Sequence, residues 1–353
     1  MRKPRVVVVG YGFAGRGFHC YLVKLAPGLV LHGVASRNPG TRERIEREQG
    51  VRAYAGMDEV TADRDVDLVV LATPSSTHAG LAVKAMEAGK HVVTDKVMCV
   101  SLEECDRMIS AARRAGVLLT VFQNRRLDGD FLTLRKVLGD GELGELRWLE
   151  MAWQGFGPPG GWRGRADMGG GRFLDLGAHL VDQLLLLMPR SIETVWCRMH
   201  HDFPRHDVES HSMLLVTFEG GATGVVDTTS MAAVSKPRFW ACGTRATFAK
   251  YGLDPQEAAM LAGDIDGAVE AEDAYATVAD TQGRRRVPTV PGRWRTYYEN
   301  IAEVLTRGTE PLVKLEEARR VMAVLDAGMS SARSGEVVHM TLPASSQGAA
   351  RER

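Results

Sequence analysis

Three polar residues stand on an otherwise apolar stretch near the middle of the chain. The segment GGGRFLDLGAHLVDQLLLLMP, residues 169–189, carries Asp175, His179 and Asp182 at steps of four and three residues. In an α-helix these steps place all three on one face, within about 60° of arc. Buried charge is costly unless it is paired, so we expect Asp175 to accept a hydrogen bond from His179. An imidazole oriented in this way is suited to proton transfer at its other nitrogen.

Other interpretations of this segment stay open. Asp182 is either a further partner of the pair or a structural anchor. A buried histidine is most often a satisfied core residue, and His179 could be one. The glycine-rich stretch GGWRGRADMGGG, residues 160–171, directly precedes the pair. A carboxylate and an imidazole beside such a loop favour a catalytic role for both.

Lys96 is the second candidate for chemistry, because of its place in the sequence. It follows the β-rich run HVVTD, residues 91–95, which we expect to be a strand of a parallel sheet. Ligands of doubly wound sheets bind beyond the carboxyl ends of the strands. A lysine at that edge can hold a reacting oxygen and offset the negative charge that develops on it. The alternative is a surface lysine at a strand end.

A glycine motif near the N-terminus indicates a nucleotide site. Gly10, Gly12 and Gly15 form G-x-G-x-x-G directly after the run VVVV and before a helical stretch, with Phe13 and Ala14 inside the motif. This context makes the motif informative, because such glycines allow a tight turn and close approach of the backbone to a pyrophosphate. The helix that follows offers free N–H groups and a favourable dipole to the phosphates. The alternative is a glycine-rich turn of an ordinary α/β domain.

The end of the second predicted strand bears on which dinucleotide would bind. Enzymes that use NAD usually place an acidic residue there, to bind the ribose 2′-hydroxyl. Here the strand ends in Ser36 and Arg37, without a carboxylate. A hydroxyl and a guanidinium suit a 2′-phosphate, so we predict NADP as the preferred cofactor. The alternative is that Arg37 stacks on the adenine and that NAD is accepted as well.

The remaining pattern predicts the elements that must position these residues. Over residues 1–125, short β-rich runs alternate with helical stretches, which indicates a doubly wound parallel sheet. Over residues 126–340, longer β-like runs with turn signals between them accompany a few helices, which predicts an α+β domain with an antiparallel sheet. The small, polar and charged segment 341–353 is expected to be a disordered tail.

Composition narrows the class of protein. The chain has 353 residues, enough for two domains, and 44 basic residues balance 44 acidic ones. A net charge of zero argues against nucleic-acid binding. No apolar run approaches a membrane span, and the basic start MRKP, which leads directly into a β-rich run, is not expected to be a secretory signal. Five scattered cysteines without a C-x-x-C pair fit a reduced cytoplasm.

A histidine-rich stretch offers a competing interpretation, metal-assisted chemistry. Imidazoles and a carboxylate of the kinds that suit zinc occur in the segment MHHDFPRHDVESH. They are His200, His201, Asp202, His206 and His211. Their spacing matches no zinc motif, so we interpret the segment as a polar loop and expect no metal site.

Several motifs together resemble those of the Gfo/Idh/MocA oxidoreductases. They are GYGFAG, ATPSSTH, AMEAGKHVVTDKV, DLGAHLVD and KLEEARRVMAVLDAGMSSARSG. The likeness runs from about residue 4 to about residue 340. The segments VFQNRRLDGDFLTLRKVL and GGGRFLDLGAHLVDQ are most similar to those of the NADP-dependent scyllo-inositol dehydrogenase subgroup.

The resemblance implies a fold and a reaction. It implies a Rossmann domain followed by a domain with an open antiparallel sheet, which is often used to form homo-oligomers. It implies reversible hydride transfer between NAD or NADP and sugars, inositols or related carbonyls. Lys96 would then bind the substrate oxygen, and Asp175 with His179 would transfer the proton. The sequence itself does not identify which sugar or polyol is the substrate.

The same resemblance assigns further residues to the pocket. Thr73, Pro74, His78 and Asp95 would shape the cofactor site. Asn124 would approach both nicotinamide and substrate, and Arg125 would approach them beside it.

In the glycine-rich loop, Trp162 and Arg163 are candidates for contact with an apolar sugar face and with hydroxyl groups; loop packing and surface charge are the alternative. We expect Tyr298, on a late helix, to be a core aromatic residue.

Two departures from the family pattern stand out, and two further functions stay open. The usual Glu-Lys-Pro is Asp95-Lys96-Val97, and the usual Thr-Pro-Asn is Thr73-Pro74-Ser75. Since proline restricts φ, its replacement by Val97 is expected to leave the backbone after Lys96 less restrained. The open alternatives are NAD-dependent glycoside cleavage through a transient oxidation and a non-catalytic redox sensor built on the same nucleotide-binding domain.

Overall fold

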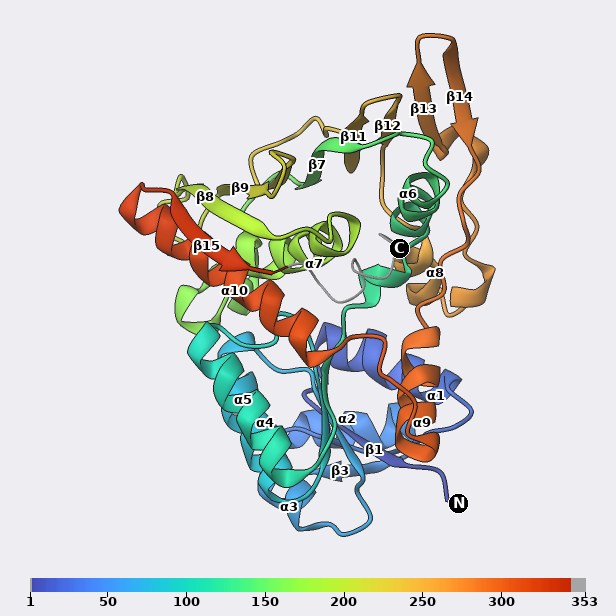
Figure 1. The fold of residues 1–353 in the computed structure, drawn as a ribbon. Coiled ribbons are helices and arrows are strands. Elements are labelled where there is room, and N and C mark those ends of the chain that lie inside the picture. The colour runs from blue at the N-terminus through green and yellow to red at the C-terminus, as the bar shows by residue number, and fades with distance from the viewer. Residues whose placement is uncertain (1, 344–353) are drawn as a thin grey trace. The chain divides into compact units, whose positions relative to one another are not determined.

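The computed structural model describes residues 2–343 (Figure 1), and within them the chain forms two compact units. The first unit comprises the residues up to Asn124 together with Trp294–Arg319. The second comprises Arg125–Arg293 and the described residues from Arg320 onward. Residues 344–353 of the predicted tail lie outside the described residues.

The first unit is built on a six-stranded sheet in the order β3-β2-β1-β4-β5-β6. Every neighbouring pair in it is parallel. This confirms the predicted doubly wound sheet, whose strand order reverses between β1 and β4. The strands are β1 (Arg5–Val9), β2 (Val30–Ala35), β3 (Arg52–Tyr54), β4 (Leu68–Leu71), β5 (His91–Thr94) and β6 (Leu119–Val121).

Helices connect these strands, as parallel pairing requires. They are α1 (Tyr21–Leu25), α2 (Pro39–Gln49), α3 (Met57–Ala62), α4 (His78–Glu87) and α5 (Leu102–Ala115), and α9 (Thr296–Arg307) also belongs to this unit. Local sequence sets the ends of α5. The Ser101 side chain accepts a hydrogen bond from the Glu104 amide at 3.1 Å, and Gly116 follows the helix with a φ of 63°.

The second unit contains a nine-stranded sheet in the order β14-β13-β12-β11-β7-β10-β9-β8-β15. Its pairs are antiparallel except for β7 and β10, which run parallel. The exception is possible because α7, β8 and β9 lie between these two strands in the chain, a connection long enough for a crossover. The predicted antiparallel sheet is therefore confirmed in the main, with one parallel pair at its centre.

Its strands are β7 (Leu146–Gln154), β8 (Ile192–His200), β9 (His211–Phe218), β10 (Thr223–Thr229), β11 (Phe239–Gly243), β12 (Thr247–Lys250), β13 (Ala276–Asp280), β14 (Gly283–Val287) and β15 (Val338–Leu342). The helices α6 (Gly129–Gly139), α7 (Ala178–Leu187) and α8 (Gln256–Leu261) lie in the same unit. The long helix α10 (Leu315–Ser334) contributes its residues from Arg320 onward.

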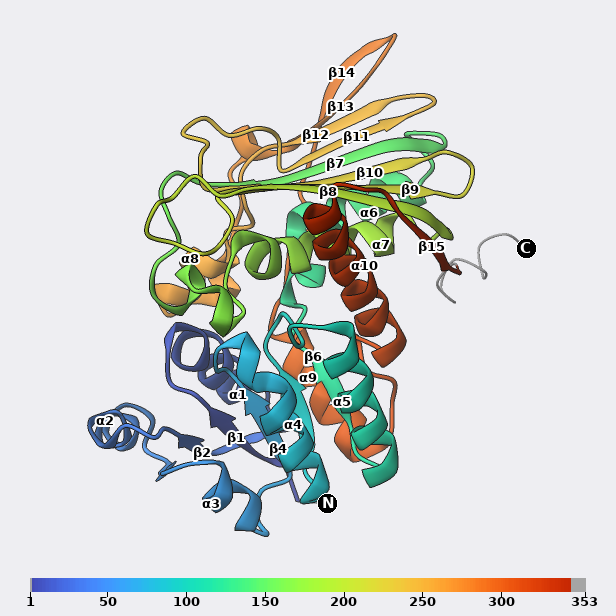
Figure 2. The same cartoon turned by 90° about the vertical axis from the view of Figure 1, so that its left-hand side faces the viewer.

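The two faces of the nine-stranded sheet differ. Figure 2 shows α6 and α7 on one face, and a side chain at Gly224 of β10 would lie 2.5 Å from Leu184 of α7. On the opposite face, Trp148 of β7 is 39% exposed and Trp240 of β11 is 40% exposed. Since Trp240 pairs with Glu150, two residues after Trp148, the two indoles share that face. We call it the open face.

No helix among residues 2–343 combines the length and the apolar character needed to cross a membrane. Tyr298 of α9 is fully buried, as expected of a core aromatic residue.

Candidate active site

The three motif glycines have different physical reasons to be glycine. Gly10 has a φ of 103°, and a β-carbon there would lie 2.4 Å from the Ala72 carbonyl oxygen. A β-carbon at Gly15 would lie 2.0 Å from the Gly10 carbonyl oxygen. A β-carbon at Gly12 would meet nothing within 4 Å. Gly10 and Gly15 are therefore required by the turn itself, whereas Gly12 leaves space where a pyrophosphate would approach. The residues present fit a dinucleotide.

The end of β2 presents the predicted Ser36 and Arg37 beside a cation that the sequence analysis missed. Arg42 of α2 donates to the carbonyl oxygens of both residues, each at 3.1 Å. The Ser36 hydroxyl accepts from the Asn38 amide at 3.3 Å, and the Arg37 side chain is exposed. Arg42 lies in the first turn of α2, the helix that follows β2. The signal available in the sequence was a second arginine close after Ser36 and Arg37.

His78 holds together two segments that the family resemblance assigns to the cofactor pocket. Its Nδ1 lies 3.0 Å from the Val97 carbonyl oxygen and its Nε2 lies 2.9 Å from that of Thr73. Burial lowers the pKa of His78, although Asp95 acts in the opposite direction. A neutral ring donates only one of the two bonds. The loop after β4 and the segment after β5 thus meet at one buried imidazole.

Lys96 follows β5 and comes directly after Asp95. A buried pair, His19 and Tyr298, lies next to the Asp95 carboxylate. The Lys96 amide donates to Asp95 Oδ1 at 2.8 Å, and the peptide bond to Val97 is cis. His19 Nε2 lies 3.6 Å from Asp95 Oδ2, and His19 Nδ1 lies 2.7 Å from the Tyr298 hydroxyl. His19 and Tyr298 were not identified as a pair from sequence, because α9 lies far from the first strands along the chain.

The charge of Asp95 is set by this environment. Burial raises the pKa of Asp95, but His19, Lys96 and His78 outweigh burial, so the pKa lies below its ordinary value. Burial raises the pKa of Tyr298 well above its ordinary value, so this hydroxyl stays protonated. The Asp95 carboxylate is therefore ionised and lies beside Lys96. His19 lies between this carboxylate and the neutral hydroxyl of Tyr298.

The segment that carries Asp175 and His179 is helical, but its first turn is wider than an α-helix. Residues Phe173–Gly177 form a π-helical turn, and α7 begins at Ala178. The expectation of one continuous α-helix is therefore wrong at its start. Wide turns of this kind are frequent at functional sites. Asp175 Oδ2 accepts from Arg163 Nε at 3.1 Å, and His179 is only 4% exposed.

A buried carboxylate that the sequence analysis did not identify holds this turn. Glu209 Oε1 accepts from the Phe173 amide at 2.5 Å, and burial raises the pKa of Glu209. Gly171, with a φ of 97°, makes room for it, since a β-carbon there would lie 2.4 Å from Glu209 Oε2. Glu209 lies in the histidine-rich segment, and nothing in its neighbouring residues indicates a contact with the turn at Phe173.

The other predicted residues of this unit lie around the same helix. Arg163 also lies over the Trp162 ring, with its guanidinium carbon 4.7 Å from the ring centroid. Asp182 pairs with Arg126 through two hydrogen bonds of 2.8 and 2.6 Å; the Asp182 side chain is buried, and that of Arg126 is 10% exposed. Of the two interpretations of Asp182, this geometry supports the structural anchor.

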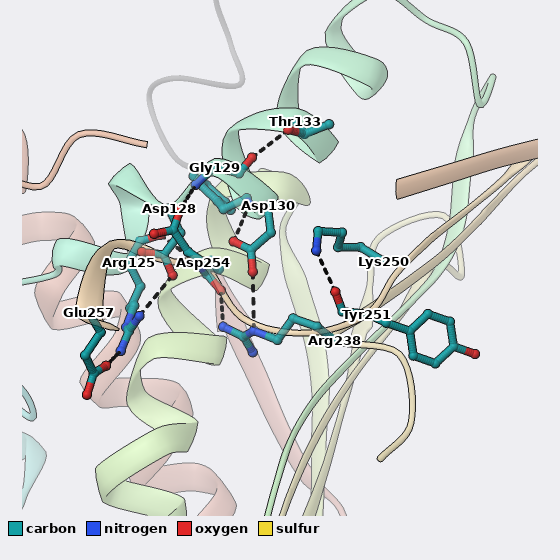
Figure 3. Close-up of polar contacts among 12 residues, drawn as sticks. Arg125, Asp128, Gly129, Asp130, Thr133, Arg238, Lys250, Tyr251, Asp254 and Glu257 are labelled. Carbon is teal, nitrogen blue, oxygen red and sulfur yellow. Dashed lines mark hydrogen bonds and ion pairs between the residues drawn. The ribbon is translucent and has the colours of Figure 1, made fainter. Parts of the chain in front are cut away.

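Asn124 and Arg125 are both buried; along the chain, Asn124 belongs to the first unit and Arg125 begins the second. Figure 3 shows the Arg125 guanidinium directed toward Asp128 and Glu257, at 3.5 and 2.5 Å. Burial lowers the pKa of Arg125, but these two carboxylates outweigh burial and raise it. The charge of Arg125 is thus partly balanced by two carboxylates of its own unit, and its contact with substrate stays a prediction.

No group of histidine, cysteine, aspartate and glutamate side chains within residues 2–343 is arranged to hold a metal ion. In the histidine-rich segment, His211 Nε2 lies 3.0 Å from Asp227 Oδ1, and the His200 and His211 rings stack at 5.8 Å.

The predicted residues thus form two groups, one in each unit. Thr73, His78, Asp95 and Lys96 lie at the carboxyl ends of β4 and β5, in the same unit as the glycine turn. In the second unit, Asp175 and His179 lie in the π-helical turn and the first turn of α7, and Arg163 contacts Asp175 from the glycine-rich loop.

Comparison with family models matches both units. Residues 4–123 match the oxidoreductase family with an NAD-binding Rossmann fold, and residues 131–249 match the GFO/IDH/MocA C-terminal domain. The chain belongs to the GFO/IDH/MocA oxidoreductase family. The chain is therefore an oxidoreductase with an NAD(P)-binding Rossmann domain, as its motifs predicted.

Individual members of the family are similar along nearly the whole chain. The uncharacterized oxidoreductase YdgJ of Escherichia coli is 33% identical, over 93% of this chain and 96% of its own length. The scyllo-inositol 2-dehydrogenase (NADP(+)) IolW of Bacillus subtilis is 29% identical, over 95% of each. A solved structure of yvaA from Bacillus subtilis has a TM-score of 0.89 and 26% identity, covering 96% of this chain and 99% of its own.

Proposed function

We propose that this GFO/IDH/MocA oxidoreductase transfers hydride reversibly between NADP and a secondary hydroxyl or keto carbon of an inositol, a related polyol or a sugar. The observation that carries the proposal is the buried His179 one turn after Asp175, in a chain similar to IolW over 95% of its length. An imidazole in this setting is suited to accept and return a hydroxyl proton.

The candidate residues have different roles in this reaction. His179 takes the hydroxyl proton during oxidation and returns it during reduction, with Asp175 orienting its ring. Lys96 stabilises the negative charge that develops on the substrate oxygen. Trp162 offers an apolar face to the substrate, while Arg163 holds Asp175 at 3.1 Å.

The cofactor would be held by the chain's own glycine turn and strand ends. Gly10, Gly12 and Gly15, with Phe13 and Ala14 between them, would approach the pyrophosphate. Ser36 and Arg37 would bind the 2′-phosphate of NADP. When bound, the nicotinamide supplies the hydride acceptor or donor. Thr73, Pro74, His78, Asp95 and Asn124 would shape the pocket around it.

The test is a substrate screen followed by two substitutions. Purified protein is assayed with inositols, aldoses and ketosugars by the absorbance of the reduced nicotinamide. With the best substrate, His179→Ala should lower kcat by about 100-fold or more, and Lys96→Met should do so by a similar factor. Both variants should bind NADPH normally. The exposed residues His339 and Lys3 supply matched controls, His339→Ala and Lys3→Met, which should keep normal rates.

Three outcomes would contradict the proposal. Near-normal turnover by His179→Ala would remove the proton-transfer role. Hydrolysis of glycosides without net oxidation would indicate the glycoside-cleaving chemistry instead. NADPH binding without turnover of any polyol or sugar would indicate a redox sensor.

We also infer that copies of the chain assemble through the open face and work in a reducing compartment such as the cytoplasm. The exposed indoles of Trp148 and Trp240 support the first inference. All five cysteines are free thiols, which supports the second.

A further inference from the structure

We propose that Trp153, Arg238 and Gln183 form a bracket that sets the orientation of the His179 ring. The three are positioning residues, since they would act on the reaction only through His179. The inference rests on the proposed function of His179 and adds the device that holds its imidazole in place. All four residues belong to the second unit.

The bracket begins with a ring stack. The imidazole of His179 and the indole of Trp153 lie 5.9 Å apart between centroids, at an interplanar angle of 25°. Trp153 comes from β7 and pairs in register with Thr228 of β10, and the methyl group of Thr228 lies near Gly177, just before α7. The indole therefore lies on the face of the sheet that α7 covers. Its ring plane limits how the imidazole of His179 can turn about its own bonds.

Arg238 supports the indole from a second direction. Its guanidinium carbon lies 4.7 Å from the Trp153 ring and 5.0 Å from the Phe239 ring. The side chain is 3% exposed, and its Nε and Nη1 atoms have no hydrogen-bond acceptor among the described residues. Burial lowers the pKa of Arg238 to about 10, so it remains a cation at neutral pH. Aromatic faces take the place of the missing acceptors, because a ring face attracts a cation.

Gln183 closes the bracket on the helix that carries His179. Its Oε1 accepts from Arg238 Nη2 at 3.2 Å, and its Nε2 donates to the Arg125 carbonyl oxygen at 2.7 Å. Gln183 lies one turn after His179 on α7, so both side chains project from the same side of the helix. On α7, His179 therefore stacks on Trp153 of β7, and Gln183 bonds to Arg238. Arg238 in turn contacts the Trp153 ring, which closes the set of contacts.

Acidic side chains lie around the Arg238 end of this bracket. Figure 3 shows Arg238 among the acidic side chains of Asp130 and Asp254, and the closest ion-pair distance, from Arg238 Nε to Asp130 Oδ2, is 3.9 Å. Burial raises the pKa of Asp130. The guanidinium carbon of Arg125 also lies 4.9 Å from the Trp153 ring. The indole therefore has two buried cations beside it as well as the imidazole.

Stability alone is a poor explanation for this arrangement. When the Arg238 guanidinium is buried, it loses its hydration, and two of its nitrogens have no acceptor among the described residues instead. Contact with the Trp153 and Phe239 rings compensates this loss only in part. Apolar residues of similar volume often stabilise such a position as well or better. A planar cation over an indole does give what an aliphatic side chain does not, which is a fixed ring plane next to the imidazole of His179.

The experiment compares Arg238→Met with Arg238→Lys in the full-length protein. Arg238→Met should lower kcat by about tenfold to 100-fold, the effect of a small misplacement of a catalytic group. KM and the Kd for NADPH should stay within about twofold of the wild type, which is near 0.4 kcal/mol. Arg238→Lys keeps the charge but loses the planar fork, so it should not restore kcat. The matched control is Arg198→Met, at an exposed position of β8, and it should change none of these values.

A spectroscopic readout separates this inference from the proposed function. In protein labelled at histidine Cε1, the ring resonance of His179, assigned by its loss in His179→Gln, carries a ring-current shift from Trp153. Trp153→Leu should remove that shift, Trp153→Phe should reduce it, and Arg238→Met should change it. These shifts are measured without turnover, so they test the bracket even if no polyol is a substrate.

Two results would overturn the bracket. One is a kcat of Arg238→Met equal to that of the wild type in a folded protein. The other is a His179 resonance that stays in place in Trp153→Leu. If Arg238→Met fails to fold, Trp153→Phe decides by the same comparison of kcat, KM and resonance position, because it keeps an aromatic ring in the core.

Discussion

At the scale of single residues, the pKa values of two buried carboxylates, one in each candidate group, are shifted in opposite directions. The pKa of Asp95 is lowered, because His19, Lys96 and His78 outweigh the effect of burial. The pKa of Glu209 is raised, because burial dominates there. Asp95 thus remains an anion beside Lys96, whereas Glu209 accepts a backbone hydrogen bond and holds the turn before α7. A carboxylate therefore supplies negative charge at Asp95, whereas at Glu209 it fixes the position of the backbone.

The first prediction at this scale concerns His19. In His19→Gln the carboxylate of Asp95 loses a favourable neighbour, so the pKa of Asp95 should rise. The acidic limb of the pH profile of kcat should therefore move to higher pH, while rates above the limb change little. The other groups that lower the pKa of Asp95 are Lys96 and His78, and they remain in the variant.

The matched control uses the neighbouring tyrosines of α9. Tyr298→Phe removes the hydroxyl that contacts His19 at 2.7 Å, whereas Tyr297→Phe removes one that donates to the Val121 carbonyl oxygen at 2.8 Å. Only the first should move the acidic limb. Equal pH profiles for both variants and the wild type would contradict the role of the His19 contact.

A second residue-scale prediction concerns the choice of cofactor. Arg37→Ala should lower kcat/KM for NADP by about tenfold or more, the loss of about 1.5 to 3 kcal/mol for a hydrogen bond to a charged group. It should leave kcat/KM for NAD within about twofold. The comparison is made from initial rates with each cofactor. A wild-type enzyme with a higher kcat/KM for NAD than for NADP would contradict the preference.

At the scale of elements, both candidate groups depend on π-helical turns. Residues Ala14–Cys20 form one at the end of the glycine motif, and Phe173–Gly177 form the other. The first carries Gly15 and His19, and the second carries Asp175. A wide turn rotates the residues after it relative to an α-helix, so it changes which side chains share a face. The positions of Asp175 and His179 are set by this turn, not by α-helical spacing.

The glycine turn gives a prediction that separates folding from binding. Gly10→Ala should destabilise the protein by about 1 to 3 kcal/mol or more, because φ is positive and the Ala72 carbonyl is in the way. Gly12→Ala should change stability little, since space is open there, but it should weaken NADPH binding severely. Chemical denaturation measures the first effect and NADPH fluorescence titration the second. Normal NADPH affinity of Gly12→Ala would argue against pyrophosphate at this turn.

At the scale of the whole molecule, the two sheets differ in how many of their faces are covered. The parallel sheet consists of fully buried runs such as Val6–Val8 of β1, as expected when helices cover both faces. The nine-stranded sheet has α7 on one face and exposed indoles on the other. Exposed tryptophan side chains on a sheet face are typical of a surface that binds another protein.

This face predicts assembly of identical chains. Trp240→Asp should lower the molar mass measured by light scattering toward the 38.5 kDa of one chain. A charged residue in the centre of an apolar interface is strongly unfavourable. The control is Val269→Asp, at an exposed position outside the sheet strands, which should keep the mass of the wild type. A wild-type mass equal to one chain would contradict assembly.

The sequence by itself determined the alternation of elements and the glycine motif, and it singled out Lys96, Asp175 and His179 as candidates, because these inferences depend on local patterns and on neighbouring residues. Contacts between distant segments were decided only by tertiary structure. Tyr298 meets His19 across 279 residues, and Gly129 meets Asp254 across 125.

Glu209, Arg238 and Trp153 likewise could not be assigned from their neighbours in the chain. Their roles arise where a sheet, a helix and a loop pack together, and burial there decides which charges persist and which rings face one another. Side-chain spacing along one element reports which residues share a face, whereas the partner on the other side of that face is chosen by packing.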